Sequence, residues 1–281
     1  MDEAEIKRLY IEKPDEEVKL LCSHATRYEG FLDILLSGLL LSSEEAKELL
    51  GTIKTHRGSS MTRGKEERYY DTNKYISFST GFVSFKYSDH KIRKREDYVG
   101  GLGIIVPLDN ILNNLYLGFS HCSRKGGIKD YKLNEENIVQ AVHMTRKSGE
   151  LYDDGYGNLF EVSLWPQGDE IAGSYLPKAI AYPHLNIKDE VVVAIPEFLQ
   201  QKIIVDINAR QEEYKRFLDK ISNQDPEKLK WKTIDGRDLD YVERMIPFMD
   251  KMVEPFEIDS LPVAWYDDRN MDIFLQRLAI Q

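Results

Sequence analysis

Three short segments combine strand-like apolar runs with side chains that can bind or polarise a substrate. The segment from Ser23 to Arg27 carries His24, the segment from Tyr75 to Gly81 carries Ser79, and the third begins at Glu190 and continues into three valines. An imidazole, a hydroxyl and a carboxylate are groups that orient a substrate and stabilise charge developing on it. Each of the three groups lies within or beside a predicted strand, in this order along the chain.

The strands that would hold these groups are predicted from apolar runs bounded by polar or turn-forming residues. The predicted strands are Val18–His24, Lys74–Thr80, Leu102–Val106, Asn158–Trp165, Ala179–Ala181, Glu190–Ile195 and Lys202–Ile207.

Helices are predicted from apolar residues at helical spacing and from capping residues. Gly38 lies near the end of a first helix that begins around Phe31, and Ser42 with Glu45 forms a capping box for a second. The pattern over Asn134 to Ser148 predicts a scaffold helix, so His143 within it is not a site candidate. Further helices are predicted around Tyr214–Ile221, Leu239–Ile246 and Met271–Ile280.

The order of these elements predicts an α+β fold. Strands dominate the chain to about residue 208, and residues 209–281 read as a helical C-terminal region. We therefore expect an α+β domain over residues 1–208 that carries the site, followed by helices that dock a target or cover the core.

Composition limits the class of protein. Of the 281 residues, 42% are hydrophobic and the net charge is −10. No stretch approaches the roughly 20 apolar residues that span a bilayer, and the charged N-terminus with Pro14 does not read as a cleavable signal peptide. The acidic balance argues against general nucleic-acid binding, and the basic run Lys91–Arg95 is interpreted as a solvated loop.

Cys22 and Cys122 supply neither a disulfide framework nor a zinc-ligand spacing. We expect no metal and a reducing compartment, either the cytoplasm or the cytosol of a host cell reached by bacterial secretion. Pairing Cys22 with His24, or His121 with Cys122, suggests a thiol hydrolase, but no third orienting group is evident.

From about Leu20 to Ile207 the three motifs resemble the mono-ADP-ribosyltransferase family. The resemblance implies a split two-sheet β-core that binds NAD⁺ in its cleft and uses NAD⁺ as a substrate. It also implies a macromolecular acceptor, most simply a protein target, as in bacterial toxins and effectors of this family.

His24-Ala25-Thr26 is similar to the H-x-T element of one branch of the family. That similarity implies that His24 binds a ribose hydroxyl of NAD⁺ and that Thr26 helps at the same sugar. Arg27 is an alternative, because another branch uses an arginine near this point.

Phe78-Ser79-Thr80 resembles the Ser-Thr-Ser element of the arginine-type branch, with Gly81 in place of the last serine. By that resemblance Ser79 braces the catalytic site and Thr80 contributes to NAD⁺ binding. The histidine-type branch instead stacks a tyrosine on nicotinamide. Tyr75 is the first candidate for that role, and Tyr87 is a second.

Glu190 resembles the catalytic glutamate of the family. The carboxylate would stabilise the oxocarbenium-like charge that forms on ribose as nicotinamide leaves. Arginine-modifying members carry Glu or Gln two residues earlier, where this chain has Lys188, which makes arginine a less favoured acceptor. The neighbouring Asp189 is expected to point to the opposite face of the strand.

The pyrophosphate of NAD⁺ would meet a loop guanidinium, and Arg57, Arg63 and Arg93 are open candidates. The predicted function is transfer of ADP-ribose with release of nicotinamide. Two alternatives stay open at this point: an NAD⁺ glycohydrolase, in which water is the acceptor, and a non-catalytic binding module on the same fold.

Overall fold

A computed structural model describes the chain in segments. These are residues 1–12, 18–26, 28–42, 45–46, 49, 76–82, 102–115, 117–124, 127–131, 139, 159–164, 183–188, 191–223 and 240–281.

Strands in the described segments form two sheets. The strands are β1 (Leu21–Ala25), β2 (Leu39–Leu41), β3 (Ile76–Thr80), β4 (Gly103–Pro107), β5 (Leu117–Arg124), β6 (Gly127–Tyr131), β7 (Leu159–Leu164), β8 (His184–Asn186), β9 (Val192–Pro196) and β10 (Val263–Tyr266). The larger sheet has eight strands in the order β10-β9-β4-β1-β3-β7-β5-β6, and β2 pairs with β8 in a second, two-stranded sheet. Neighbours are antiparallel except for the parallel pair β9 and β10.

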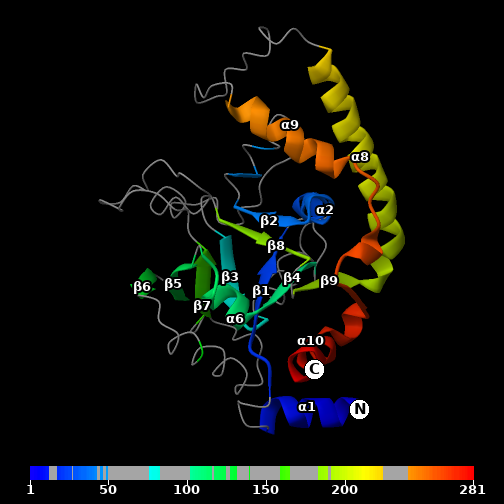
Figure 1. Cartoon of the computed structure of the whole chain (residues 1–281). Helices are drawn as coiled ribbons and strands as arrows, with labels where there is room; N and C mark the ends of the chain where they lie inside the picture. Colours follow the sequence, from blue (N-terminus) through cyan, green and yellow to red (C-terminus); the bar gives the residue numbers. More distant parts are fainter. Residues whose placement is uncertain are drawn as a thin grey trace.

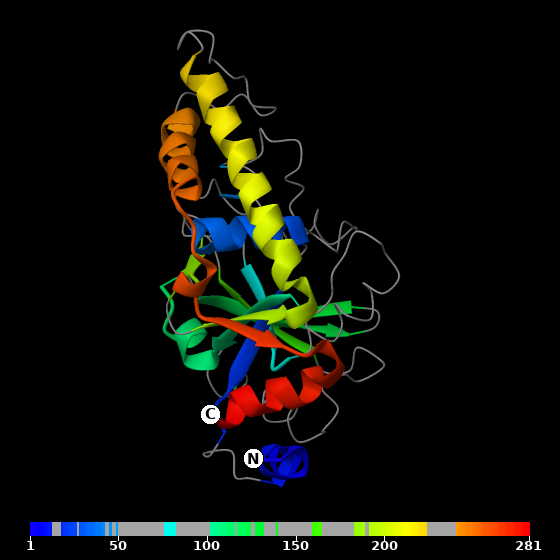
Figure 2. The ribbon, with the colours of Figure 1, turned by 90° about the vertical axis from the view of Figure 1, so that its right-hand side faces the viewer.

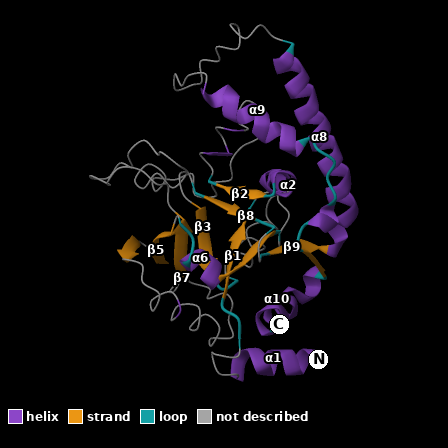
Figure 3. Ribbon diagram, in the orientation of Figure 1, coloured by secondary structure: helices purple, strands orange, loops and turns teal. Residues whose placement is uncertain are grey.

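Helices cover both faces of the larger sheet (Figures 1 and 3). The α-helices with described bounds are α1 (Glu3–Glu12), α2 (Tyr28–Ser37), α6 (Leu108–Leu112), α8 (Gln200–Ser222), α9 (Asp240–Met252) and α10 (Met271–Ile280). Short 3-10 turns are η3 (Glu197–Leu199), η4 (Ile258–Ser260) and η5 (Asp268–Asn270). Helices α2, α8 and α9 lie on one side, while α10 and α1 lie on the other (Figure 2).

The alternation of side chains along each strand builds two separate apolar cores. On β1, Cys22 belongs to the core under α2, α8 and α9, whereas Leu21 belongs to the core under α1 and α10. On β9, Val193 faces the first core and Ala194 the second. At β1 and β9 the sheet is therefore buried on both faces.

Local backbone signals read from the sequence are confirmed at α2 and just after it. Helix α2 ends at Ser37, and Gly38 follows with a φ of 69°, the left-handed geometry that glycine tolerates best. The hydroxyl of Ser42 accepts a hydrogen bond of 3.2 Å from the backbone N–H of Glu45. Gly38 therefore ends the helix just before β2, and Ser42 caps the turn just after β2.

The predicted strand Lys202–Ile207 is wrong, because this segment lies in the first turns of α8. Its β-branched residues suggested a strand, but Ile203 and Ile207 continue into Arg210 and Tyr214 as one buried face at helical spacing. Packing of that face against α2 and α9 outweighs the local β propensity.

An α+β fold is confirmed at the level of its elements. Five predicted strands appear as β1, β3, β4, β7 and β9, and the helices predicted near Tyr214, Met245 and Met271 appear as α8, α9 and α10. The predicted boundary after residue 208 falls inside α8, and β10 of the C-terminal region joins the larger sheet. The predicted segments Ala179–Ala181 and most of Asn134–Ser148 lie outside the described residues.

Within the described segments, no helix combines the length and apolar character needed to cross a bilayer.

Candidate functional site

His24 is placed on β1, directly beside β3. Its ring Nδ1 lies 2.8 Å from the backbone oxygen of Ser77. A carbonyl can only accept, so Nδ1 carries the hydrogen and donates it, which leaves Nε2 of the neutral ring as an acceptor. Burial lowers the pKa of His24, and the hydrogen bond to Ser77 offsets only part of that effect. The ring is therefore neutral at physiological pH, in one defined tautomer.

The face of β3 that meets His24 is the one carrying Phe78. The two rings pack edge to face, with centroids 5.8 Å apart and planes at 62°. Because strand side chains alternate, Ser77 and Ser79 lie on the opposite face of the sheet. The structure thus brings the β1 and β3 motifs together, but it does not bring the side chains of His24 and Ser79 onto one face.

Thr26 and Gly81, which belong to the same two motifs, each make a defined local contact. Thr26 is buried, and its Oγ1 lies 3.2 Å from the point where a Cβ would stand at Gly30, so it fills the start of α2. Gly81, which replaces the last serine of the predicted element, has a φ of 64° and donates its N–H to the oxygen of Leu21. This left-handed turn favours glycine over serine.

Several predicted site residues lie outside the described residues. These are Glu190, Arg27, Tyr75, Tyr87, Asp189, Arg57, Arg63 and Arg93. Thr80 is the last residue of β3 and pairs with Cys22 by backbone register.

The strand that follows Glu190 lies close to His24 in the sheet. His24 is opposite Ile104 of β4, and Ile104 is opposite Val193 of β9. Strand β4 alone therefore lies between β1, which carries the histidine motif, and β9, which begins two residues after Glu190. Lys188 is exposed in the turn after β8, with its Cε 3.4 Å from the Cβ position at Gly38.

A pocket of about 680 Å³ opens on the face of the sheet opposite His24. Its polar members are Lys19, Asp109 and Asn110, and its apolar members come from β1 and the residues just before it, from β4 and from α10. Val191 and Val192, which directly follow Glu190, also line it. Among the described lining residues, none was predicted as a site residue. The volume is in the range of small-molecule sites.

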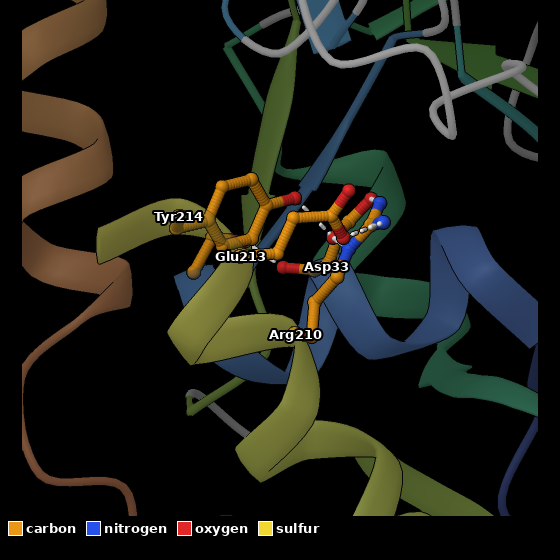
Figure 4. A network of polar contacts seen from close by, with 5 residues as sticks. Asp33, Arg210, Glu213 and Tyr214 are labelled. Atoms are coloured by element: carbon orange, nitrogen blue, oxygen red, sulfur yellow. Dashed lines mark hydrogen bonds and ion pairs between the residues drawn. The ribbon is translucent and has the colours of Figure 1, made fainter. Parts of the chain in front are cut away.

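A buried ionic cluster, not foreseen from the sequence, joins α2 to α8 (Figure 4). Asp33 accepts two hydrogen bonds of 2.9 Å from the guanidinium of Arg210 and a third from the hydroxyl of Tyr214. Arg210 also donates to Glu213 at 3.0 Å. Burial alone would lower the pKa of Arg210, but the hydrogen bonds and charge of Asp33 raise it, so the pair stays ionised. The mutual pairing indicates a structural clamp.

A second polar contact lies at the start of α2. The hydroxyl of Tyr28 donates to Asp206 at 2.6 Å, Lys202 pairs with the same carboxylate, and the Lys202 ammonium lies 4.4 Å from the Tyr28 ring centroid. Burial, followed by the hydrogen bond to Asp206, raises the pKa of Tyr28. The contact anchors the chain that directly follows the histidine motif.

The thiol of Cys22 does not suit nucleophilic chemistry. It is fully buried, and burial raises its pKa to about 12, with only partial relief from the backbone of Gly81. A reactive cysteine needs a lowered pKa and access to substrate. Among the described residues, no group of three or more His, Cys, Asp or Glu side chains is placed to hold a metal ion.

Comparisons of this chain with protein-family models, with curated proteins and with solved structures returned no match.

Proposed function

We propose that this protein is an ADP-ribosyltransferase that consumes NAD⁺, releases nicotinamide and transfers ADP-ribose to a macromolecular acceptor, most simply a protein. The proposal includes the split two-sheet core of that family as the finer description of the α+β fold. The proposed setting is a reducing cytosol, either of the producing cell or of a host cell reached by bacterial secretion.

The observation that carries the proposal is the state of His24. Its neutral ring is held by the Ser77 carbonyl with Nε2 left as an acceptor, which is the arrangement needed to accept a hydrogen bond from a ribose hydroxyl. A histidine held this way orients a sugar without adding charge. Orientation of the ribose matters because a displacement of about 1 Å can cost a hundredfold in rate.

Strand order supports the same proposal. The order β9-β4-β1-β3 clusters the strands that carry or directly follow the three motifs, although they are far apart in sequence. Because Ser79 lies on the other face from His24, the histidine-type arrangement is favoured over the arginine-type one. Thr26 is two residues after His24, in the chain just beyond β1, so its side chain lies on the same side of the extended chain as that of His24, as the H-x-T element requires.

The proposed reaction breaks one bond at the ribose and forms one bond at the same carbon. The bond between C1′ of the ribose and the nicotinamide nitrogen breaks, and nicotinamide leaves with the electron pair. The acceptor atom bonds to C1′ and gives up its proton. Glu190 is assigned the carboxylate that stabilises the positive charge on the ribose between these events.

The test is incubation of the protein with labelled NAD⁺ in a eukaryotic lysate and, separately, in a bacterial lysate. Wild type is compared with Glu190→Gln and with Glu212→Gln, a matched change at an exposed position on α8. We expect a labelled band in the wild type and in Glu212→Gln, and at least about a hundredfold less label in Glu190→Gln. Full labelling by a folded Glu190→Gln variant would remove Glu190 from the proposal.

The same assay separates the alternatives. Free ADP-ribose and nicotinamide without labelled protein would identify an NAD⁺ glycohydrolase, for which water is the acceptor. No nicotinamide release by the folded wild type in either lysate would contradict the enzyme and leave the non-catalytic binding module.

A further inference from the structure

Strand β10 forms one edge of the eight-stranded sheet. It follows β9 in the strand order, and within the described residues no strand pairs with its other side. Its sequence, Val263 to Tyr266, contains no charged residue. Edge strands are often protected from pairing with another chain by short length, a lysine, a proline or a bulge. Here the proline is Pro262, directly before β10, and all four strand residues keep their backbone N–H. In Figure 2, β10 is seen in front, between the lower end of α8 and α10.

The register between β9 and β10 shows which backbone groups point outward. Val193 donates its N–H to the oxygen of Pro262, and Val263 is the parallel partner of Val193. Along a strand of a parallel ladder, the N–H and C=O of one residue point to the same side, and the side alternates from one residue to the next. Because the C=O of Pro262 points toward β9, the N–H and C=O of Ala264 point toward β9 as well. The N–H and C=O of Trp265 therefore point away from the sheet, where a further strand would bind.

An exposed apolar patch begins beside the end of β10. Tyr266 pairs with Pro196, and Phe198 follows two residues later with 63% of its surface exposed. Val205, two helical turns further on, is also 63% exposed, and Ile204 is 40% exposed. Grouped exposed apolar side chains are a feature of protein–protein contacts. The patch supplies apolar contacts for a segment that pairs with the edge.

The charges near β10 indicate which charge a segment bound to this edge would carry. Glu257 and Asp259 precede β10, Glu197 stands at the start of η3, and Asp268 follows β10, all with exposed side chains. The basic residues in the stretches 197–206 and 257–270 are Lys202 and Arg269, and Lys202 is already paired with Asp206. A second copy of this chain would bring the same carboxylates together and be repelled, whereas a basic segment would be attracted.

We propose that the β10 edge, together with the Phe198–Val205 patch, binds an extended, basic segment of a partner protein by strand addition. The partner's backbone pairs with Trp265, its alternate apolar side chains contact the patch, and its Lys or Arg residues meet the surrounding carboxylates. This inference is independent of the proposed transferase activity, because it uses none of the residues assigned to NAD⁺.

Two variants at one position test the backbone contact. Trp265→Pro removes the outward N–H and leaves the hydrogen bonds of Ala264 and Tyr266 to β9, because the N–H and C=O of Trp265 point away from that strand although its Cα is in register with Ile195. Trp265→Val removes the same indole ring but keeps the N–H, and is the matched control. Circular dichroism and thermal unfolding show whether both variants are folded.

The probe is a pool of capped, fluorescent twelve-residue peptides with alternating valine and varied polar residues, flanked by two lysines at each end. A matched pool carries glutamates instead of the lysines. Anisotropy titrations measure affinity, and amide hydrogen exchange reports on Trp265. We expect the lysine pool to bind wild type and Trp265→Val, to protect the Trp265 amide, and to bind Trp265→Pro about tenfold more weakly. The glutamate pool should bind at least about tenfold more weakly than the lysine pool.

Four results would overturn the proposal. They are no binding of the lysine pool to wild type, equal affinities of folded Trp265→Pro and Trp265→Val, equal affinities of the two pools, and a wild-type dimer that dissociates in Trp265→Pro. The last result would assign the edge to a second copy of the chain.

Discussion

His24 and the Asp33–Arg210 pair are both covered polar groups, but their hydrogen bonding differs. The Asp33 carboxylate accepts from Arg210 at both oxygens and from Tyr214 at one of them. His24 is a single neutral ring with one hydrogen bond, at Nδ1, and an acceptor remaining at Nε2. The first arrangement is satisfied by the protein itself, while the second has capacity for an outside donor.

This difference separates a structural clamp from a candidate binding group. Buried charges are tolerated when their partners are complete, and their loss is felt in stability. His24 keeps one acceptor, Nε2, that an outside donor can use. Substitutions in the two regions should therefore affect different measurements.

The largest effect on stability is expected for Arg210→Met. It removes the cation that neutralises Asp33 and leaves a buried carboxylate without its countercharge. We expect a loss of about 3–5 kcal/mol in the free energy of unfolding, measured by urea denaturation. Lys215→Met, which breaks an exposed ion pair on the same helix, should leave the unfolding midpoint unchanged.

The double variant Asp33→Leu with Arg210→Met sharpens this result. If the cost comes from the unpaired charge, removing both charges should recover most of the lost stability. Equal destabilisation in the single and double variants would instead assign the cost to packing of the long arginine side chain.

A smaller effect is expected for Tyr214→Phe. The ring is kept, and only the hydroxyl that donates to Asp33 is lost. Because the acceptor is charged and buried, we expect a loss of about 1.5–3 kcal/mol in the same urea titration. A loss below about 0.5 kcal/mol would mean that Arg210 alone satisfies the carboxylate.

The smallest effect is a pH dependence from His24. Burial holds its pKa below the usual 6.5, so the unfolded chain takes up a proton that the folded chain does not. The stability from neutral His24 is complete above pH 6.5 and is lost as the pH falls from there toward the lowered value.

His24→Asn removes this titration and can still donate to the Ser77 carbonyl. Urea unfolding between pH 7.5 and 5 should show that stability falls less steeply with pH in the variant. The difference in slope should correspond to the uptake of at most one proton on unfolding. Identical pH profiles would mean that His24 titrates alike in the folded and unfolded chains.

The sequence predicted the elements that depend on local patterns. Gly103–Pro107 and Met271–Ile280 appear within one residue of their predicted bounds, because their apolar runs, and Pro107 in the first, act locally. Lys202–Ile207 failed because its β-branched residues hid a buried helical face that only packing against α2 and α9 makes decisive. Tertiary contacts override propensity at such positions.

The site residues show the same division between what local sequence patterns predict and what tertiary contacts decide. The proximity of the His24 and Ser79 segments followed from their strand character, but the opposite faces of the two side chains depend on strand register, which no local motif fixes. The partner of Asp33 lies 177 residues away at Arg210, beyond any local pattern. The available signal was an aspartate inside the otherwise apolar helix around Phe31 and Leu35, since such a charge needs a partner.

The central claim is that Nε2 of His24 binds NAD⁺. The most direct measurement is calorimetric titration of NAD⁺ into Glu190→Gln, which is expected to bind NAD⁺ without consuming it, and into the same protein with His24→Asn. The account predicts binding that is about tenfold weaker in the His24→Asn protein, with an unchanged unfolding midpoint at pH 7.5. Equal affinities in the two proteins, or no NAD⁺ binding by the folded Glu190→Gln protein, would contradict it.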